Sequence, residues 1–539
     1  MRRSFAALAL LASSALLVAI TSPANAQAKR PLRSGDLYHI KDVRDPQISP
    51  DGGWVAYTVS TIDSAKDKSD NDVWITSWDG ATTIRVTSSP ESESTPRWSP
   101  DGRYLAFLSG RQEGKGAQIW LLDRRGGEAQ RVSQLRGGVS EFAWSPDSKR
   151  MILVVDEETD SIARKDTAEH KTPKPIVINR YNFKRDVAGY LGTKRSHLSL
   201  FDVETKKTET LTSSLDDDGS PSWSPDGRMI AFVRGPVAEP DRSRDDDVFV
   251  IEARAGATPK RLTDFVGPDG GRPAWSPDGK WIAFFRGDEP KYQAYNLSKL
   301  AIVASDGSTP ARVLTEALDR PLSNAQFSAD GKSVYVLLSD DREQQLARVR
   351  VADGSVERLI SGKRVVSSYS TAGGKFVVMS STPERSGEVY AWENNALRQL
   401  SHQNDSLFAQ LQLAATEGFS SKSKDGTEVH GVLVRPANAP VGKLPTILYI
   451  HGGPNGQDSY SFSFDREFFA ANGYAVLSVN YRGSSGRGSA YQKAIFADWG
   501  DKEVMDLLGA VDEAVRSGVA DPERLGIGGW SYGGILTDA

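Results

Sequence analysis

Short apolar runs separated by turn residues recur over the first two-thirds of the chain. Runs such as Tyr104–Leu108 and Trp281–Phe285 are rich in aromatic and aliphatic residues, as is typical of strands. A further apolar run follows each of them, as at Gln118–Leu122, and a Gly-containing turn then leads to a short one, as at Ala129–Val132. With the residues before the first run, each unit predicts four strands.

A Ser-Pro-Asp-Gly turn or a close variant lies between the first two strands of each unit. Pro and Asp-Gly favour tight turns, and an apolar or aromatic residue precedes the motif. A four-stranded unit of this size cannot bury both faces alone, so the units must stack radially. We therefore expect a seven-bladed β-propeller over residues 27–410. The copies start at Ser49, Ser99, Ser145, Ser224, Ser276, Ser328 and, in a degenerate form, Ser370.

The gap between the third and fourth copies is longer than the others. It predicts an insertion in the third blade, from roughly Glu157 to Arg195. The insertion contains an aromatic and basic stretch, Ile176–Lys184. We favour a packed hairpin for this stretch over the lining of a substrate chamber.

The pattern changes near Leu411. Val429–Val434 alternates like an edge strand, whereas Thr446–Ile450 and Ala475–Val479 are continuous apolar runs of the kind buried in parallel sheets. Strands alternating with helices predict a doubly wound α/β domain over residues 411–539. Its expected helices are Asp465–Asn472, the segment Val504–Val515 that ends before Gly518, and a last one from Tyr532 onward.

Gly529-Trp-Ser-Tyr-Gly533 follows the strand-like run Leu525–Gly528. This is the G-x-S-x-G nucleophile elbow, in which small residues allow a sharp turn from strand to helix. The turn lifts the hydroxyl of Ser531 above the sheet as a nucleophile. The backbone N–H of Tyr532 then points at the oxyanion that develops during acyl transfer.

A second Gly-rich loop, His451-Gly-Gly-Pro454, follows the strand Thr446–Ile450. Glycines at this place allow a backbone N–H, here that of Gly453, to approach a substrate oxygen. We interpret His451 as a residue that anchors the loop rather than as the general base. The loop Asn480–Gly488 lacks Gly-Lys-Ser/Thr and a following helix, so we expect a structural loop at the rim of the site.

Composition excludes several classes of function. The chain has 539 residues, a net charge of −4 and no cysteine, which argues against nucleic-acid binding and excludes thiolate chemistry and disulfides. None of the six histidines has a metal-ligand spacing, so we expect no metal. Gly526-Ile-Gly528-Gly529 departs from the dinucleotide fingerprint at Ser531, so we expect no cofactor.

Residues 1–26 have the pattern of a secretory signal peptide. Arg2 and Arg3 are followed by the apolar run Phe5–Ile20 and by Ala24-Asn-Ala26, a cleavage site of the A-x-A type. A membrane anchor is the alternative, but the run is short for a bilayer. We expect a secreted, periplasmic protein that does not associate with a membrane after cleavage.

Six segments together resemble the prolyl oligopeptidase family of serine peptidases, and most closely its acylaminoacyl-peptidase and dipeptidyl-peptidase-like branch. The propeller repeats are similar to the N-terminal domain of that family. The resemblance implies an α/β-hydrolase domain and cleavage of oligopeptides between the two domains. It implies the roles of nucleophile for Ser531 and of oxyanion-hole N–H donors for Tyr532 and Gly453. The segments are His451–Pro454, Gly473–Val476, Asn480–Ser484, Asp498–Asp501, Asp521–Arg524 and Gly529–Gly534.

The triad aspartate and histidine of that family would lie after Ala539. We therefore expect the hydrolase domain in this sequence to be incomplete, cut just after the nucleophile elbow, and inactive by itself. One alternative is a periplasmic binding protein whose propeller is the functional part, as in TolB. Another is an esterase on the same scaffold, because an elbow and an oxyanion hole serve any acyl transfer.

Overall fold

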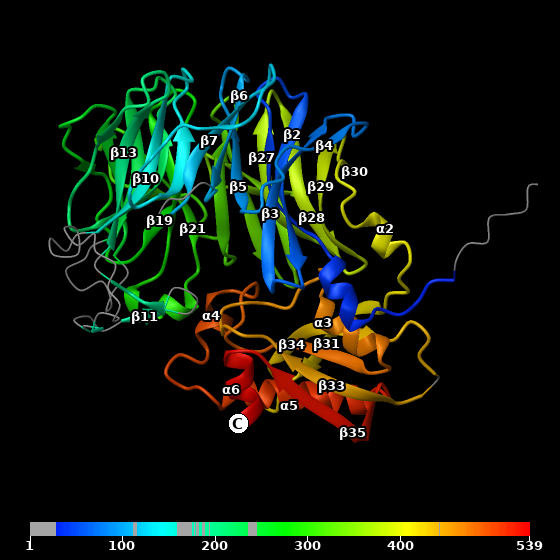
Figure 1. Ribbon diagram of the computed structural model, residues 1–539. Coiled ribbons are helices and arrows are strands. Elements are labelled where there is room, and N and C mark those ends of the chain that lie inside the picture. The colour runs from blue at the N-terminus through cyan, green and yellow to red at the C-terminus, as the bar shows by residue number, and fades with distance from the viewer. Residues whose placement is uncertain are drawn as a thin grey trace, which may run out of the picture.

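The computed structural model describes residues 28–111, 116–158, 175–176, 178, 183–185, 189–192, 194–235, 245–440 and 442–539. A ring of sheets lies above a smaller α/β unit (Figure 1). The signal-peptide prediction for residues 1–26 falls outside the described residues. No described helix is both long and apolar enough to cross a membrane.

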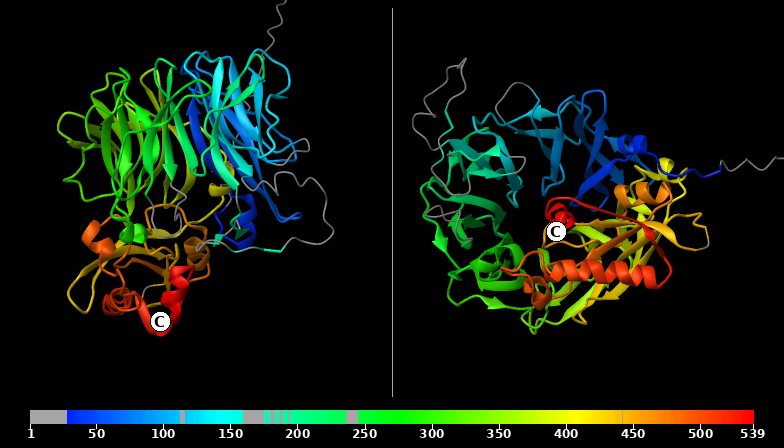
Figure 2. Two further views of the ribbon diagram at one scale, coloured as in Figure 1. Left: turned by 90° about the vertical axis from the view of Figure 1, so that its left-hand side faces the viewer. Right: turned by 90° about the horizontal axis from the view of Figure 1, so that it is seen from below.

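Seven successive groups of four antiparallel strands form the ring, which Figure 2 shows along its axis. The predicted seven-bladed propeller is thus confirmed. Blade 1 is β1 (Asp42–Ile48), β2 (Trp54–Asp63), β3 (Lys68–Ser77) and β4 (Thr83–Arg85); blade 2 is β5 (Glu93–Trp98), β6 (Tyr104–Ser109), β7 (Gln118–Asp123) and β8 (Gln130–Arg131); blade 3 is β9 (Val139–Trp144), β10 (Arg150–Glu158), β13 (Lys194–Asp202) and β14 (Thr208–Thr210); blade 4 is β15 (Asp217–Trp223), β16 (Met229–Gly235), β17 (Asp247–Glu252) and β18 (Lys260–Arg261). Blade 5 is β19 (Asp269–Trp275), β20 (Trp281–Arg286), β21 (Lys299–Ala304) and β22 (Arg312–Val313); blade 6 is β23 (Leu322–Phe327), β24 (Ser333–Asp340), β25 (Glu343–Arg350) and β26 (Val356–Ile360); blade 7 is β27 (Val365–Ala372), β28 (Lys375–Thr382), β29 (Arg385–Glu393) and β30 (Ala396–Gln399).

The Ser-Pro-Asp-Gly motif forms the turn between the first two strands of a blade. In blade 5 the hydroxyl of Ser276 donates to Asp278 Oδ1 at 2.6 Å, and Gly279 adopts a φ of +71°. The positive φ explains the glycine, because other residues rarely adopt it. In blade 4 the hydrogen bond from Ser224 lowers the pKa of Asp226 to about 2.

The tryptophan before the motif links neighbouring blades. The indole N–H of Trp223, in blade 4, donates to Ala143 O in blade 3 at 3.1 Å, and Trp275 bonds Ser222 O in the same way at 3.2 Å. Trp98 and Trp144 make equivalent bonds to Gln47 O and Arg97 O. Each such residue therefore fixes its blade against the one before it.

The insertion of blade 3 leaves the sheet between β10 and β13, which pair directly with each other. Most of the stretch 176–184 lies outside the described residues. A short hairpin begins at its end, where β11 (Lys184–Arg185) pairs with β12 (Gly189–Tyr190). Ile176 and Ile178 are exposed.

The α/β unit is built on a sheet with the strand order β31-β32-β34-β33-β35. The core strand β33 is parallel to both β34 and β35, as the apolar runs predict. The expectation of an edge strand at Val429–Val434 is wrong. This segment belongs to β32, which is covered on its outer side by β31, a strand with little alternation in its sequence. The strands are β31 (Ala415–Lys422), β32 (Glu428–Arg435), β33 (Leu444–Ile450), β34 (Ala475–Asn480) and β35 (Ala520–Gly529).

Four helices accompany this sheet within the described residues. They are α3 (Phe464–Ala471), α4 (Ser489–Lys493), α5 (Lys502–Arg516) and α6 (Tyr532–Asp538), and a further helix, α2 (Asp405–Phe408), precedes the sheet. The expectation that no helix follows Gly488 is wrong, since α4 begins at the next residue. The hydroxyl of Ser463 caps α3 by accepting the N–H of Arg466 at 3.4 Å.

Two short 3₁₀ helices lie where the propeller meets the α/β unit. The first, η1 (Ser34–His39), follows a bridge between Arg30 and Leu411. The second, η2 (Pro290–Tyr295), connects β20 to β21 in blade 5. Lys493 in α4 forms an ion pair with Asp288 just before η2, with Nζ and Oδ1 2.8 Å apart.

Candidate active site

Ser531 lies on the turn between β35 and α6, where the sequence predicts a nucleophile. Its backbone has φ 56° and ψ −117°, a conformation that a residue with a side chain rarely adopts. The flanking glycines are required by space, because a Cβ on Gly533 would lie 2.1 Å from Ile450 O. A strained and exposed serine on such a turn is the geometry of a nucleophile elbow.

The loop 451–454 lies beside this turn. A Cβ on Gly452 would be 3.2 Å from Ser531 Cβ, so the absence of a side chain there allows the close approach. Gly453 adopts a φ of +138°, which favours glycine. Within the described residues the N–H groups of Gly453 and Tyr532 donate to no acceptor. Both donors are therefore available to a substrate oxygen.

His451 is hydrogen-bonded through both ring nitrogens, and neither bond goes to Ser531. Its Nδ1–H donates to Gly452 O at 2.8 Å, which leaves Nε2 to accept the hydroxyl of the buried Ser484 at 3.0 Å. Its ring stacks on Tyr481, with centroids 4.5 Å apart. With both nitrogens bonded, this ring fits the expected anchor of the loop.

Tyr532 is buried beside Ser531. Its hydroxyl donates to Glu503 Oε1, and its ring meets Trp499 edge to face with centroids 4.9 Å apart. Burial, together with the hydrogen bond to Glu503, raises the pKa of Tyr532 above its usual range, so the phenol stays a donor. No motif of the sequence predicts a role for Glu503 or Trp499, although Trp499 belongs to the segment Asp498–Asp501 that carries part of the family resemblance.

In the part of the chain that the structure describes, no imidazole or carboxylate is hydrogen-bonded to the hydroxyl of Ser531. Among the same residues, no three His, Asp or Glu side chains are grouped so that they could hold a metal ion. The turn at Ser531 therefore presents an exposed hydroxyl and two N–H donors, and no described imidazole or carboxylate is bonded to that hydroxyl.

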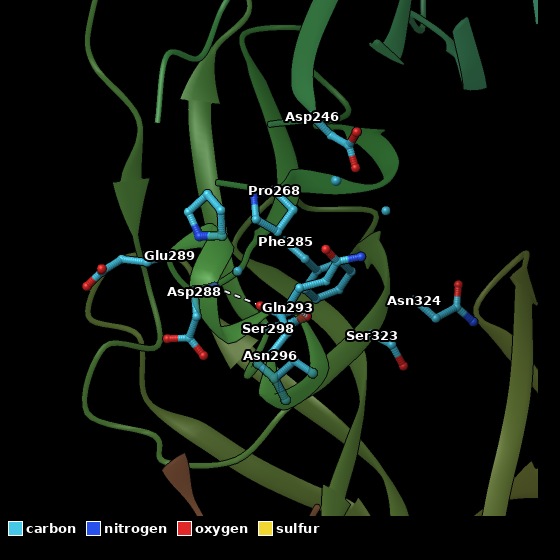
Figure 3. A pocket seen from close by; sticks show the side chains of 15 residues that line it. Asp246, Pro268, Phe285, Asp288, Glu289, Gln293, Asn296, Ser298, Ser323 and Asn324 are labelled. Atoms are coloured by element: carbon cyan, nitrogen blue, oxygen red, sulfur yellow. Dashed lines mark hydrogen bonds between the residues drawn. The ribbon is translucent and has the colours of Figure 1, made fainter. Parts of the chain in front are cut away.

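A cavity of about 280 Å³ lies between blades 5 and 6, with η2 as one wall. Figure 3 shows the side chains of Gln293, Asn324 and Asp246 around it. Pro268 and Phe285 supply apolar surface. The described lining residues all come from the propeller, while the other side of η2 carries Tyr292 and Tyr295 against Phe496 of the α/β unit.

The chain is similar to known proteins over both the propeller and the α/β unit. A family model described as TolB beta propeller domain matches residues 40–175 and 188–407, and one described as prolyl oligopeptidase family matches residues 460–539. The uncharacterized peptidase YuxL of Bacillus subtilis is 31% identical over 530 residues, covering 95% of this chain and 80% of that protein. The chain belongs to the prolyl oligopeptidase family of serine peptidases.

Further relatives in the prolyl oligopeptidase family carry more specific names. Dipeptidyl-peptidase 5 of Porphyromonas gingivalis is 25% identical over 525 residues, covering 92% of this chain and 74% of that protein. The solved acylaminoacyl peptidase of Pyrococcus horikoshii superposes with a TM-score of 0.77 at 23% identity, over 93% of this chain and 75% of the other. This superposition confirms the fold, a propeller combined with a hydrolase domain.

Proposed function

We propose that this protein is an exported oligopeptidase in which Ser531 is the nucleophile and the N–H groups of Tyr532 and Gly453 form the oxyanion hole. The observation that carries the proposal is the strained turn at Ser531, with two unused N–H donors beside it. The names of the relatives support a dipeptidyl- or acylaminoacyl-peptidase-like substrate preference. The substrate is an oligopeptide rather than a nucleic acid, and no cofactor takes part.

The chemistry follows from these groups. The oxygen of Ser531 attacks the scissile carbonyl, and the negative charge that develops on the carbonyl oxygen is stabilised by the two N–H groups. A general base takes the serine proton and returns it to the leaving amine, and water then hydrolyses the acyl-enzyme. In the prolyl oligopeptidase family this base is a histidine oriented by an aspartate.

The proposal is tested with the natural full-length protein and its Ser531→Ala variant. We expect a fluorophosphonate probe to label only the former, and dipeptidyl and N-acetyl-aminoacyl p-nitroanilides to be cleaved at least about 10³-fold faster by it. Peptide binding without cleavage or labelling would instead show a TolB-like binding protein. Cleavage of p-nitrophenyl acetate but of no anilide would show an esterase.

Export is proposed from the sequence of residues 1–26 alone. We expect the protein in the periplasmic fraction, with an N-terminus at Gln27. An intact N-terminus in the membrane fraction would contradict this and indicate an anchor.

A further inference from the structure

A tyrosine of the propeller lies in the hydrophobic core of the hydrolase. Tyr295, the last residue of η2, is 4% exposed and belongs to the same core cluster as Leu507 and Tyr532. Its hydroxyl donates to Ile495 O at 3.3 Å and accepts the indole N–H of Trp499. One phenol of blade 5 is thus bonded to two groups of the catalytic domain.

Trp499 carries this contact to the residue that follows the nucleophile. The indole is 55% exposed, so packing alone leaves much of its surface free. The hydrogen bond from its N–H to Tyr295 therefore restricts the orientation of the indole ring. This ring contacts Tyr532 edge to face, with an interplanar angle of 74°.

Glu503 links Tyr532 to the loop that contains Trp499. Its Oε1 accepts the hydroxyl of Tyr532 and also the N–H of Gly500, at 2.8 Å, next to Trp499. The carboxyl group is fully buried, and its Oε2 has no hydrogen-bond partner within the described residues. Tyr532 is held from two sides, by Trp499 and by Glu503.

We propose that Tyr295 is a positioning residue for the nucleophile turn, acting from the propeller through Trp499 on Tyr532. Ser531 has a strained backbone, and Tyr532 is the first residue of α6. A shift of the Tyr532 ring therefore moves the adjacent N–H. The effect on catalysis rests on the proposed function, since that N–H is the proposed oxyanion donor, whereas the effect on the order of the turn does not.

The test uses Tyr295→Phe, which removes only the hydroxyl, and Trp499→Phe, which keeps an aromatic ring against Tyr532. Tyr57→Phe is the matched control, because its buried hydroxyl also accepts a side-chain N–H, that of Gln403, but in blade 1. All variants are made in the natural full-length protein. Hydrogen exchange of the segment 527–536 and the values of kcat and KM on an anilide and an ester are measured.

We expect Tyr295→Phe and Trp499→Phe each to speed exchange across 527–536 and to lower kcat about 5-fold, the factor that a typical hydrogen bond represents. KM should stay unchanged, because the oxyanion contact forms in the transition state. The double variant should lose no more than either single variant, since both remove the same bond. Tyr57→Phe should change none of these values.

Unchanged exchange in 527–536, or additive effects of the two substitutions, would overturn the proposal. Faster exchange with unchanged kcat would overturn its catalytic part. If the protein cleaves neither substrate, the proposed function fails, while the exchange measurement still decides whether Tyr295 orders the turn.

Discussion

The propeller and the α/β unit are stabilised in opposite ways. In the propeller, the four strands of a blade are contiguous or nearly so, and one link, such as that from Trp223 to Ala143 O, recurs around much of the ring. In the α/β unit no hydrogen bond or packing contact is repeated from one element to the next in this way. One residue of its hydrophobic core, Tyr295, comes from blade 5 of the propeller. The ring therefore contains what it needs for stability, whereas the catalytic unit depends on the ring.

Separating the two regions should have the largest effect. We expect residues 28–401 to unfold cooperatively as a β protein, because no strand of a blade comes from elsewhere. Residues 411–539 alone should be poorly folded, since they lose Tyr295 from their core. In addition, β35, the outer strand of the described sheet, already exposes Leu525 and Ile527 in the whole chain. Circular dichroism melts of both pieces check this.

Limited proteolysis of residues 27–539 is a second test of the difference in stability between the propeller and the α/β unit. The first cuts should fall after about residue 410 and leave a propeller-sized core. Equal protection of both regions would contradict the comparison.

Gly533→Ala should unfold the α/β unit while the propeller stays folded. The new methyl group would lie 2.1 Å from Ile450 O, a backbone atom that cannot move aside, so we expect a loss of about 4 kcal/mol or more. Gly534→Ala is the matched control, because its nearest neighbour would be at 3.8 Å. Calorimetry should show that the unfolding transition of the α/β unit is lost in Gly533→Ala and kept in Gly534→Ala. Equal effects of the two variants would contradict the steric explanation.

Glu467 should make the α/β unit sensitive to neutral pH. This residue is 4% exposed, and burial raises its pKa to about 7, although Oε2 accepts the N–H of Ala414 at 2.9 Å. A carboxyl whose pKa is higher in the folded than in the unfolded state contributes stability below about pH 4.5, and this stability is lost as the pH rises through about 7. The loss should be on the order of 3 kcal/mol.

The variant Glu467→Gln tests whether Glu467 causes this loss of stability as the pH rises. The variant should remove most of the difference between the free energies of unfolding of the α/β unit at pH 5 and at pH 8.5, measured by urea titration. The change expected from the raised pKa of Asp247 in blade 4 stays in the unfolding of the propeller. Glu417→Gln, in an exposed ion pair with Arg435, should leave that difference in place. A pH dependence that survives in Glu467→Gln would show that another group is responsible.

Trp223→Phe should have the smallest effect, about 1 kcal/mol, confined to the propeller. It keeps an aromatic ring and removes the N–H bond to blade 3. Trp530→Phe is the control, since that side chain is 81% exposed. A shift in the unfolding of the α/β unit would contradict the independence of the ring.

The propeller was largely predictable because its information is local and repeated. Each Ser-Pro-Asp-Gly copy marks one turn, and the apolar or aromatic residue before it, a tryptophan in blades 2 to 5, marks the first strand of its blade. The turn at Ser531 was predictable for a similar reason, since Gly529 and Gly533 lie within a few residues of it and their spacing carries the geometry.

The contacts between the regions were not predictable from the sequence. Tyr295 lies in what reads as an ordinary loop of blade 5, and its hydroxyl meets Trp499 some 200 residues later. The inner place of β32 depends on its pairing with β31, whose sequence, Ala415–Lys422, has few apolar residues. Local patterns contain no sign of such distant partners.

The indole links also set how the ring responds to mechanical stress. Blades 2 to 5 each carry an indole whose N–H donates to a carbonyl oxygen of the preceding blade. In blade 7 the hydroxyl of Tyr369 donates to Asn324 O of blade 6 at 2.7 Å. Blade 6 has Phe327 at this place, which has no polar hydrogen to donate. The joint between blades 5 and 6 also borders the cavity beside η2. Blade 1 lacks an indole as well, since Ile48 stands at this place. A force that widens the ring therefore meets no indole bond at the joint between blades 5 and 6, and the wall that it would displace there is η2, the element that holds Tyr295.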